Sequence, residues 1–242
     1  MDLENKVIVI TGASKGLGRE LALQLAKEKT KLALVARSES DLTDLKKLVE
    51  KEGSKCEYFL CDVSKDKEVF STVHKIMEKF GTIDILINNA GIWFEGKLEE
   101  HTPEKVRELF DTIALGTIYF SMAILPHMRK QKDGIIFNLV SVGGIEAPGE
   151  YGPYTPYTSA KYAVTGFSKA LEDELKGTGV KVLGFYPAGM NTELFRSAGF
   201  NYKDNENWMM DKKDIAEIIV FILKRPRDIS MDHVVVRKFT DN

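Results

Sequence analysis

Apolar residues follow two alternating patterns along this chain. Short runs that are apolar at nearly every position alternate with segments in which apolar residues recur every three or four positions, as in Leu17, Leu21 and Leu25. The first pattern predicts buried strands and the second predicts amphipathic helices. The predicted strands are residues 7–11, 31–36, 56–63, 83–88, 135–141, 180–187 and 233–238. This alternation predicts a doubly wound, seven-stranded parallel sheet in a three-layer α/β/α arrangement.

Cap residues and the lack of linkers define the organisation further. Ser38 and Ser64 are predicted N-caps of the second and third helices, and Pro103 suits the first turn of a later helix. No internal repeat and no linker rich in proline or serine is present, so residues 1–242 are predicted to form one domain.

The alternation breaks after the sixth predicted strand. An insert at about residues 190–211 carries Phe195, Phe200, Tyr202 and Trp208 among polar residues. In open α/β sheets the ligand crevice lies outside the carboxyl ends of the strands, where this insert begins. We interpret the insert as a substrate lid. The alternative is an aromatic flap that only packs on the core.

Composition narrows the classes of partner. The chain has 242 residues, 43% of them hydrophobic, and a formal net charge of −2. Without a cluster of lysine and arginine, a nucleic-acid partner is not expected. The chain begins with an acidic segment, and no apolar run reaches the roughly 18 to 20 residues that cross a bilayer. We therefore expect a cytoplasmic protein with no membrane partner.

The cysteines and histidines fit no metal site. Cys56 and Cys61 lie five positions apart in one predicted strand, so they point to opposite faces roughly 16 Å apart and cannot pair with each other. We interpret both as small core residues. The four histidines are scattered along the chain, and no metal is expected.

The turn after the first predicted strand indicates a ligand. It reads Thr-Gly-Ala-Ser-Lys-Gly-Leu-Gly over residues 11–18 and leads into a helix. Glycines at 12, 16 and 18 allow positive φ and let a diphosphate approach the backbone N–H groups at the helix start. The turn therefore predicts a dinucleotide site; the alternative is an ordinary glycine-rich turn.

The end of the second predicted strand indicates which dinucleotide binds. An acidic residue about 20 positions beyond the glycines would bind a ribose 2′-hydroxyl, but Ala36 occupies that place. Arg37 and Lys15 instead offer two cations to a 2′-phosphate. NADPH is therefore predicted to bind better than NADH. The alternative is that both cations are solvated surface residues.

A tyrosine and a lysine one helical turn apart are the candidate chemical groups. Tyr157 and Lys161 lie on one face of a predicted helix, where a lysine ammonium is expected to lower the pKa of the phenol towards neutrality. Tyr157 could then act as general acid or base on a ketone or an alcohol. Ser141 ends the fifth predicted strand, where its hydroxyl could hold a substrate carbonyl. Taken alone, the tyrosine and lysine spacing also fits an ordinary surface helix.

Together these motifs, in this order from Lys6 to about Lys238, resemble the short-chain dehydrogenase/reductase family in its compact form. The resemblance implies a Rossmann-like fold in which Ser141 orients the substrate carbonyl, Tyr157 is the acid and base, and Lys161 holds the nicotinamide ribose. It places Asp62 at the adenine, Asn89–Gly91 at the adenosine ribose, and Thr192 at the carboxamide. The implied cofactor-binding residues are Gly12, Ser14, Lys15, Gly16, Leu17, Gly18, Arg37, Asp62, Val63, Asn89, Ala90, Gly91, Tyr157, Lys161, Pro187 and Thr192.

Three positions depart from the pattern of the family. The segment between Ser141 and Tyr157 is about three residues longer than usual and contains two more tyrosines, Tyr151 and Tyr154. Neither has a lysine four residues on, so Tyr157 keeps the role of acid. Residues 187–189 read Pro-Ala-Gly where many relatives have Pro-Gly.

The third departure is Ile113, which stands where the family usually has an asparagine that supports a proton-relay water. Slower proton resupply is one expectation from this change. The alternatives are that a backbone carbonyl or Thr112 anchors the same water, or that Ile113 is simply a core residue.

The resulting expectation is an NADP-dependent oxidoreductase that passes hydride between the nicotinamide and a ketone or secondary alcohol, working as a carbonyl reductase. A small apolar or aromatic carbonyl compound is the expected substrate. Its expected contacts are Trp93, Phe94, Ser141, Tyr154 and Phe195. A 3-oxoacyl thioester is a second option, although the C-terminal segment lacks the glycine pair usual in such relatives.

A non-catalytic NADP-binding regulator or scaffold is the rival interpretation. It would be indicated by loss of Ser141, Tyr157 or Lys161, and all three are present. The resemblance also implies a homodimer or homotetramer that pairs through the fourth and fifth helices.

Overall fold

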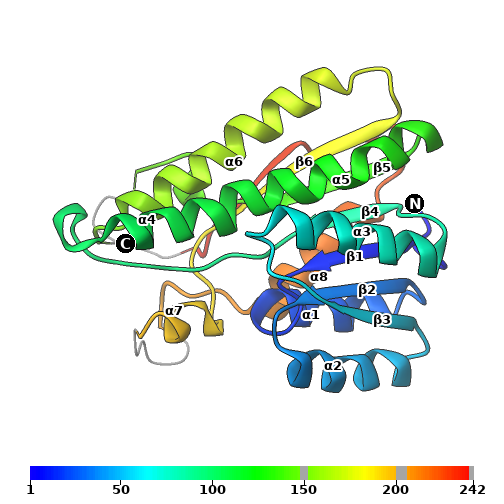
Figure 1. The fold of residues 1–242 in the computed structure, drawn as a ribbon, viewed down its shortest axis with the longest axis horizontal. Helices are drawn as coiled ribbons and strands as arrows, with labels where there is room; N and C mark the ends of the chain where they lie inside the picture. The colour runs from blue at the N-terminus through cyan, green and yellow to red at the C-terminus, as the bar shows by residue number, and fades with distance from the viewer. Residues whose placement is uncertain (148–151, 200–205, 240–242) are drawn as a thin grey trace.

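A parallel sheet of seven strands runs through the centre of the molecule (Figure 1). The computed structural model describes residues 1–147, 152–199 and 206–239. The strands are β1 (Val7–Thr11), β2 (Lys31–Ala36), β3 (Lys55–Leu60), β4 (Ile85–Asn88), β5 (Gly134–Leu139), β6 (Val180–Pro187) and β7 (His233–Val236). Their order in the sheet is β3-β2-β1-β4-β5-β6-β7. The predicted fold class is confirmed, and the order reverses between β1 and β4, where a crevice forms in such sheets.

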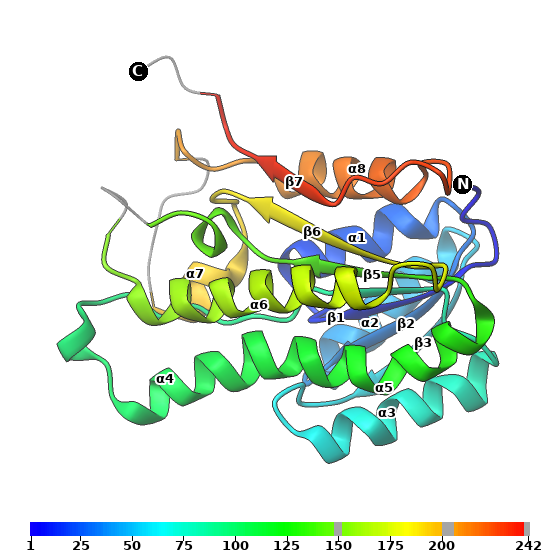
Figure 2. The ribbon, with the colours of Figure 1, turned by 90° about the horizontal axis from the view of Figure 1, so that it is seen from above.

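Helices cover both faces of the sheet (Figure 2). On one face lie α1 (Gly16–Ala26), α2 (Glu39–Lys51) and α8 (Lys212–Leu223), and on the other α3 (Asp66–Phe80), α4 (Pro103–Leu109), α5 (Gly116–Gln131) and α6 (Thr155–Glu174). Along β1, Ile8 and Ile10 belong to the first core while Val9 belongs to the second. Strand β1 therefore contributes to two cores, because successive side chains point to opposite faces.

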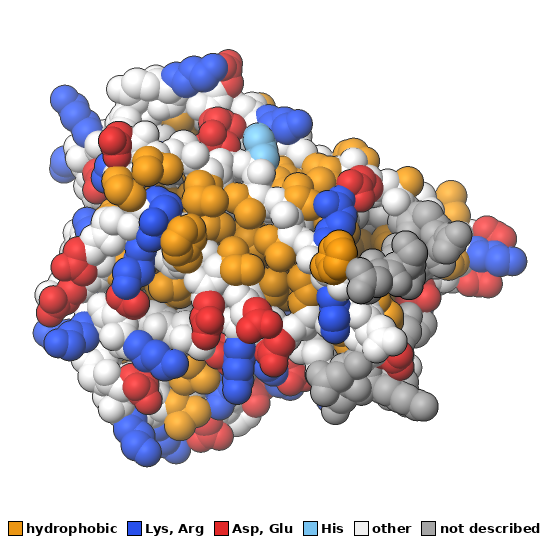
Figure 3. Space-filling view, turned by 180° about the vertical axis from the view of Figure 1, so that it is seen from behind, with side chains coloured by type: hydrophobic (Ala, Val, Ile, Leu, Met, Phe, Trp, Pro, Cys, Tyr) orange, Lys and Arg blue, Asp and Glu red, His pale blue; other side chains and the backbone are white. Residues whose placement is uncertain are grey.

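Four shorter helical elements lie outside these layers or join them. They are η1 (Leu98–Glu100), the π-helical η2 (Phe110–Leu115), η3 (Val142–Gly144) and α7 (Glu193–Ser197). Seen from the side opposite to Figure 1, apolar side chains gather across the middle of the face (Figure 3). Elements α8 and β7 lie at the back in Figure 1, and they carry exposed apolar residues such as Phe221 and Val235.

The predicted strand bounds agree with the structure for residues 7–11, 31–36 and 180–187, but the third strand ends early, at Leu60. The chain turns at Asp62, whose carboxylate accepts the Ser64 N–H at 3.0 Å and the Ser64 hydroxyl at 2.8 Å. Our prediction that Ser64 is the N-cap of α3 is therefore wrong. The N-cap is Lys65. Ser38 is the N-cap of α2 as predicted, without a capping side-chain bond.

The two cysteines lie in different cores. Cys56 is 8% exposed and packs in the core on the α1, α2 and α8 side, whereas Cys61 is 2% exposed and packs in the core on the α3 and α5 side. Both are free thiols. Burial raises the pKa of Cys56 to about 12 and that of Cys61 to about 11. The prediction of two core cysteines on opposite faces is confirmed.

One helical stretch differs from our expectation that no apolar segment is long enough to cross a bilayer. Elements α4, η2 and α5 are continuous from Pro103 to Gln131, and this stretch is long and apolar enough to cross a membrane by length and composition alone. Half of its apolar window is buried inside the protein, and α5 packs against α3 and β5. Such burial is that of a core helix in an α/β layer, and it gives no indication of a membrane span.

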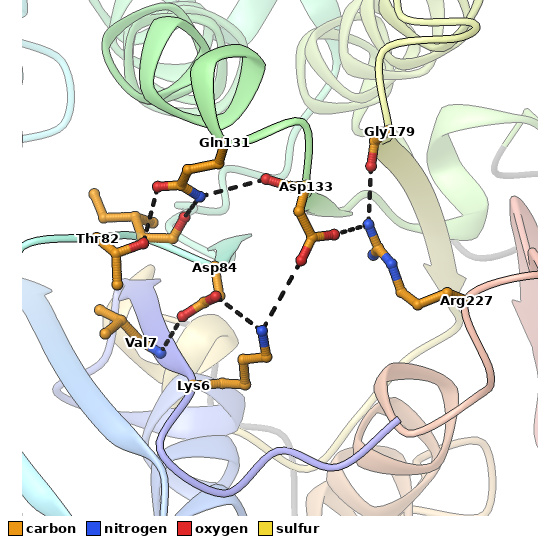
Figure 4. A network of polar contacts seen from close by, with 9 residues as sticks. Lys6, Val7, Thr82, Asp84, Gln131, Asp133, Gly179 and Arg227 are labelled. Carbon is orange, nitrogen blue, oxygen red and sulfur yellow. Dashed lines mark hydrogen bonds and ion pairs between the residues drawn. The ribbon is translucent and has the colours of Figure 1, made fainter.

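Polar contacts tie together the edge of the sheet where the strands begin (Figure 4). Asp84 accepts the Val7 N–H at 2.8 Å and the Lys6 ammonium at 3.0 Å. Lys6 also lies 3.9 Å from Asp133, which pairs with Arg227. These contacts connect the starts of β1, β4 and β5 to the segment after α8, so this edge is occupied by its own side chains.

Candidate active site

At the opposite edge, side-chain hydrogen bonds fix the distance between the ends of β1 and β4. The Thr11 hydroxyl accepts the N–H groups of Asn89 and Ala90, each at 3.0 Å. The Asn89 amide donates to the carbonyl of Thr11 at 2.8 Å and to that of Gly12 at 3.1 Å. Ala90 and Gly91 follow β4 with small or no side chains, so a ligand could lie close to the backbone here.

The glycine turn between β1 and α1 has the predicted backbone geometry. Gly12 and Gly16 have φ of +64° and +55°, the left-handed region that favours glycine. A Cβ at Gly18 would lie 2.3 Å from the Gly12 carbonyl oxygen, so no other residue fits there. Lys15, the N-cap of α1, makes no capping side-chain bond, and the first turn has no acidic residue. The backbone N–H groups in the first turn of α1 are therefore available to bind the diphosphate of a dinucleotide.

Two other residues of the turn differ in how they could contribute. The Leu17 side chain is 5% exposed and packs in the core, so Leu17 could contact a ligand only through its backbone. Ser14, by contrast, faces a cavity of about 500 Å³ beside α1. This cavity is lined by Ser14, Lys15, Arg19, Asp41, Asp44, Glu193 and Arg196.

The cations predicted to bind a 2′-phosphate lie at the expected end of the sheet. Ala36 ends β2 with a buried side chain, and Arg37 beside it is exposed. The Lys15 ammonium lies 3.4 Å from the Asp41 carboxylate. A hydrogen bond from Ser38 and the charge of Lys15 hold the pKa of Asp41 below its usual value. Lys15 is thus already paired with an acidic side chain, which the sequence pattern did not indicate.

Asp62 and Val63 follow β3 at the same edge. Burial raises the pKa of the Asp62 carboxyl, but hydrogen bonds from Ser64 and the charge of Arg37 outweigh this effect and lower it. Val63 is 7% exposed, and a Cβ at Gly116 would lie 2.9 Å from its side chain. The start of α5 therefore packs directly on this segment and holds it in place.

Ser141, Tyr157 and Lys161 are brought together after β5. The chain turns into η3 at Ser141, whose hydroxyl accepts the Gly143 N–H at 3.1 Å and lies beside the Tyr157 ring at Gly143. Tyr157 and Lys161 lie one turn apart on α6, and each is 6% exposed. The Lys161 ammonium donates to the Leu139 carbonyl at 3.0 Å and lies 5.7 Å from the centroid of the Tyr157 ring.

Burial controls the pKa of both groups on α6. It raises the pKa of Tyr157 to about 12, and the hydrogen bond with Ser141 offsets only part of this shift. Burial also lowers the pKa of Lys161 to about 7. Our expectation that Lys161 lowers the pKa of Tyr157 is therefore wrong for this structure, because both groups are withdrawn from water. The Tyr157 phenol is therefore protonated at neutral pH.

Aromatic rings surround the Tyr157 side chain. The ring centroid of Trp93 lies 4.4 Å from that of Tyr157, 4.7 Å from that of Tyr154 and 5.1 Å from that of Phe195. We call these four residues the aromatic cluster. Trp208 lies outside it and contacts Phe195, with ring centroids 5.7 Å apart. Three predicted substrate residues, Trp93, Tyr154 and Phe195, thus meet beside the candidate acid.

Phe94 does not join this cluster. Phe94 is partly buried against the same hydrophobic core, and its ring faces the Lys105 ammonium at 5.6 Å. Tyr151, one of the tyrosines that competed with Tyr157 for the role of acid, lies outside the described residues.

The ends of the insert at 190–211 are paired with each other. Met190 and Met210 form a parallel bridge. The Asn191 N–H donates to the Met210 carbonyl at 3.0 Å, and the Met210 N–H donates to the Gly189 carbonyl at 3.0 Å. The insert is thus a loop closed at its base, directly after Pro187 at the end of β6. Phe200 and Tyr202 of the predicted lid lie outside the described residues.

Thr192 connects this insert to the glycine turn. It is 8% exposed and is the N-cap of α7, its hydroxyl accepting the Leu194 N–H at 3.4 Å. A Cβ at Gly16 would lie 3.4 Å from the Thr192 side chain and 3.6 Å from the Glu193 carboxylate. Element α7 therefore lies against the start of α1, where a lid over a dinucleotide would be placed.

Three buried polar atoms without a partner lie where the strands end. Within the described residues they are Trp93 Nε1 after β4, Thr158 Oγ1 on the side of α6 that faces Gly143, and Glu193 Oε2 beside the glycine turn. Asn88 Oδ1 also has no partner among the described residues, but the Asn88 amide donates to Ser121 and Asn138 inside the core. Leaving a buried polar atom unpaired costs about 1–3 kcal/mol, so several in one place indicate a site that a ligand completes.

Ile113, the departure from the family pattern, lies in the π-helical turn η2. It is 1% exposed and packs in the same hydrophobic core as Tyr157. Its backbone carbonyl accepts the Thr117 hydroxyl at 2.8 Å. Of the alternatives left open by the sequence, the packing favours the core residue.

The structure also adds residues that the sequence did not single out. Asp41, Glu193 and Arg196 join Lys15 around the cavity, and Thr158 joins Ser141 at the other end of the crevice. Thr158 follows Tyr157 directly in the sequence, and this was the only sequence feature that could have indicated it as a site residue. The cavity residues come from α2 and α7, which no spacing rule places next to α1.

Comparison with known proteins agrees with this geometry. A model of the family described as short chain dehydrogenase matches residues 6–202. An uncharacterised oxidoreductase of Staphylococcus saprophyticus is 34% identical over 238 residues, which cover 98% of this chain and 99% of the relative.

Two solved structures share the fold over nearly their full length. An alcohol dehydrogenase from the archaeon Thermococcus sibiricus, complexed with 5-hydroxy-NADP, is 29% identical with a TM-score of 0.87 and covers 97% of both chains. A levodione reductase is 26% identical with a TM-score of 0.87, covering 98% of this chain and 97% of the other. Because the family model spans most of the chain and a relative is 34% identical over almost its full length, the chain belongs to the short-chain dehydrogenase family.

Proposed function

We propose that this chain is an NADP-dependent carbonyl reductase that passes hydride between the nicotinamide and a ketone or secondary alcohol. The observation that carries the proposal is the buried Tyr157 phenol beside Ser141 at the crevice, one helical turn from Lys161. The similarity to an alcohol dehydrogenase with a bound NADP analogue and to a levodione reductase supports the same reaction class.

Each of the three side chains has a distinct task in this mechanism. When bound, a reduced nicotinamide would supply the hydride for the carbonyl carbon. The Ser141 hydroxyl donates to the carbonyl oxygen and holds it towards Tyr157, whose hydroxyl gives its proton to that oxygen as the alcohol forms. Lys161 would hold the nicotinamide ribose and, with a pKa of about 7, can return a proton to the phenolate.

The protonation state of Tyr157 favours reduction. With its pKa raised to about 12, the phenol keeps its proton at neutral pH and is ready to act as an acid. Oxidation of an alcohol requires the phenolate, which is scarce under the same conditions.

Replacing the acid tests the mechanism. Tyr157→Phe removes the proton donor and keeps the ring, so kcat for ketone reduction should fall on the order of 10² to 10⁴-fold with almost unchanged cofactor affinity. NADPH consumption over a panel of ketones and aldehydes measures turnover, and a cofactor titration measures binding. The matched control Tyr154→Phe should lose far less turnover. A wild type that binds the cofactor and reduces nothing would support a regulator instead.

We further propose that NADPH binds better than NADH, because Arg37 stands exposed after β2 and Ala36 offers no carboxylate to a ribose 2′-hydroxyl. One charge-assisted hydrogen bond is worth roughly 1.5–3 kcal/mol. Arg37→Ala should therefore weaken NADPH by about ten- to a hundredfold and leave NADH nearly unchanged. Titration of wild type and variant with both cofactors measures this, and equal affinity of the wild type for the two would contradict it.

A further inference from the structure

Trp93 carries a hydrogen-bond donor that the proposed mechanism does not use. The residue follows the Asn-Asn-Ala-Gly segment after β4 and is 8% exposed. Its indole N–H is buried and has no hydrogen-bond partner among the described residues. A buried tryptophan normally finds a partner for this group, because leaving it unpaired costs stability.

The position of Trp93 connects this donor to the reacting end of the site. Its ring packs on Tyr157 from α6, with centroids 4.4 Å apart, and also contacts Tyr154 and Phe195. These contacts place the indole between the candidate acid and α7. Any small molecule held by the Tyr157 hydroxyl therefore lies within reach of the Trp93 ring.

A second unpartnered group lies at the same end of the crevice. The Thr158 hydroxyl is buried without a partner next to Tyr157, on the side of α6 that faces Gly143 and the Ser141 hydroxyl. A monoketone presents one oxygen, which Ser141 and Tyr157 bind together in the proposed mechanism. It would leave the Trp93 donor unpaired, whereas a second oxygen on the substrate would satisfy it.

Resting on the proposed reductase function, we propose that Trp93 determines specificity by donating its indole N–H to a second oxygen acceptor of the substrate. The substrate class is then a cyclic or aromatic dicarbonyl compound. Its flat body packs among the rings of the aromatic cluster, one carbonyl is reduced at Tyr157, and the other is held by Trp93. Aromatic rings favour flat apolar partners through area and ring packing, and the N–H supplies discrimination that packing alone does not.

The test compares two substrates that share one skeleton. Propiophenone has one carbonyl group, and 1-phenylpropane-1,2-dione adds a second carbonyl beside it. Because the dione is also more reactive, the measured quantity is the ratio of kcat/KM for the two compounds, compared between enzymes. Trp93→Phe keeps an aromatic ring and removes the donor, so it should lower the dione to monoketone ratio on the order of tenfold.

Two further variants make the result specific to the N–H group. Trp208→Phe removes the indole that contacts Phe195 rather than Tyr157, and it should leave the ratio unchanged. Replacement of Trp93 by 3-benzothienylalanine keeps the shape of the indole and exchanges N–H for sulfur, so it should lower the ratio as Trp93→Phe does. Retention of the wild-type ratio in both Trp93 variants would overturn the proposal.

Failure of this inference differs from failure of the proposed function. A wild type that reduces both compounds while the Trp93 variants change both rates equally refutes the role of the donor and leaves the reductase intact. A wild type that reduces neither compound refutes the reductase. In that case the role of Trp93 is tested by binding. The dione should raise the melting temperature of the wild type more than that of Trp93→Phe, and equal shifts would overturn the proposed role of Trp93.

Discussion

Tyr157 and Lys161 are equally buried, and their pKa values move in opposite directions for the same reason. Removing either group from water disfavours its charged form, which for a phenol raises the pKa and for an amine lowers it. Lys161 keeps one strong partner, the Leu139 carbonyl, which accepts a hydrogen bond from it without neutralising its charge. The amine at this site is therefore a titrating group near neutral pH.

This property predicts a pH-dependent stability. The pKa of Lys161 is about 7 in the folded protein against 10.5 ordinarily, so between these values the unfolded chain binds the extra proton. The free energy of unfolding therefore rises with pH across this window, by up to about 1.4 kcal/mol per pH unit from this group. Lys161→Met removes the contribution. The variant should be more stable than wild type at pH 6, and its advantage should shrink towards pH 9 in urea unfolding experiments.

Tyr157→Phe is the matched control for that experiment. The pKa of Tyr157 is raised to about 12 from 10.0, so its contribution to stability falls as pH rises from about 10 to 12 and is constant below pH 9. The stability difference between Tyr157→Phe and wild type should therefore be the same at pH 6 and pH 9. A Lys161→Met difference that is also independent of pH would mean that Lys161 stays protonated in the folded protein.

The sequence alone placed these residues but not their environment. Ser141 was found because it ends an apolar run, and Tyr157 with Lys161 because four residues make one helical turn. Their pKa values depend on how deeply the two side chains are buried, and Trp93, which packs on Tyr157, comes from a segment distant in the sequence. The Lys15–Asp41 pair escaped prediction for the same reason, since it joins the start of α1 to α2.

At the scale of elements, η2 is the place where the long helical stretch from Pro103 to Gln131 widens by one residue per turn. Its residue Ile113 faces the hydrophobic core that also contains Tyr157 and Val164. The carbonyl that this residue exposes is bonded by Thr117 within the helix. Backbone and side chain at this position are thus both engaged in packing, and π-helical turns recur next to functional sites.

Ile113→Asn should therefore destabilise the protein. Burying an amide without a partner costs roughly 1–3 kcal/mol, which corresponds to a fall in melting temperature of a few degrees for a chain of this length. Thermal unfolding measures the effect, and Ile113→Val is the control for the loss of a methyl group alone. If kcat instead rises severalfold without loss of stability, a proton relay limits the enzyme and the residue is more than core.

The insert after β6 shows why some elements could not be foreseen. Its aromatic residues led us to predict a lid. The pairing of Met190 with Met210 at its base could not be predicted from the pattern of apolar and polar positions. Likewise the third strand ends earlier than predicted, because the Asp62 side chain accepts the Ser64 N–H and forms a turn. The periodicity of apolar residues does not predict this turn. Periodicity thus defines the interior of an element better than its ends.

At the scale of the whole molecule, the two edges of the sheet are built differently. Where the strands begin, ion pairs such as Lys6–Asp84 and Arg227–Asp133 connect neighbouring segments of the chain (Figure 4). Where the strands end, glycines and unpartnered polar atoms remain. The parallel order was predictable, since strands apolar on both faces need helices on both sides, and it is this order that brings all catalytic candidates to one edge.

The oligomeric state stays a prediction. The resemblance implies a homodimer or homotetramer, and apolar side chains gather on the face shown in Figure 3. Strand β7 is the last of the sheet in the described residues, with Val235 39% exposed.

The two cysteines give the protein internal reporters of how it opens. Cys56 should react faster with an alkylating reagent when the layer of α1, α2 and α8 separates from the sheet, and Cys61 when the layer of α3 and α5 does. Because neither thiol can form a disulfide with the other across the sheet, each would record its own layer. Equal labelling rates would mean that the two sides of the sheet come apart as one cooperative unit, and unequal rates would reveal which side loosens first.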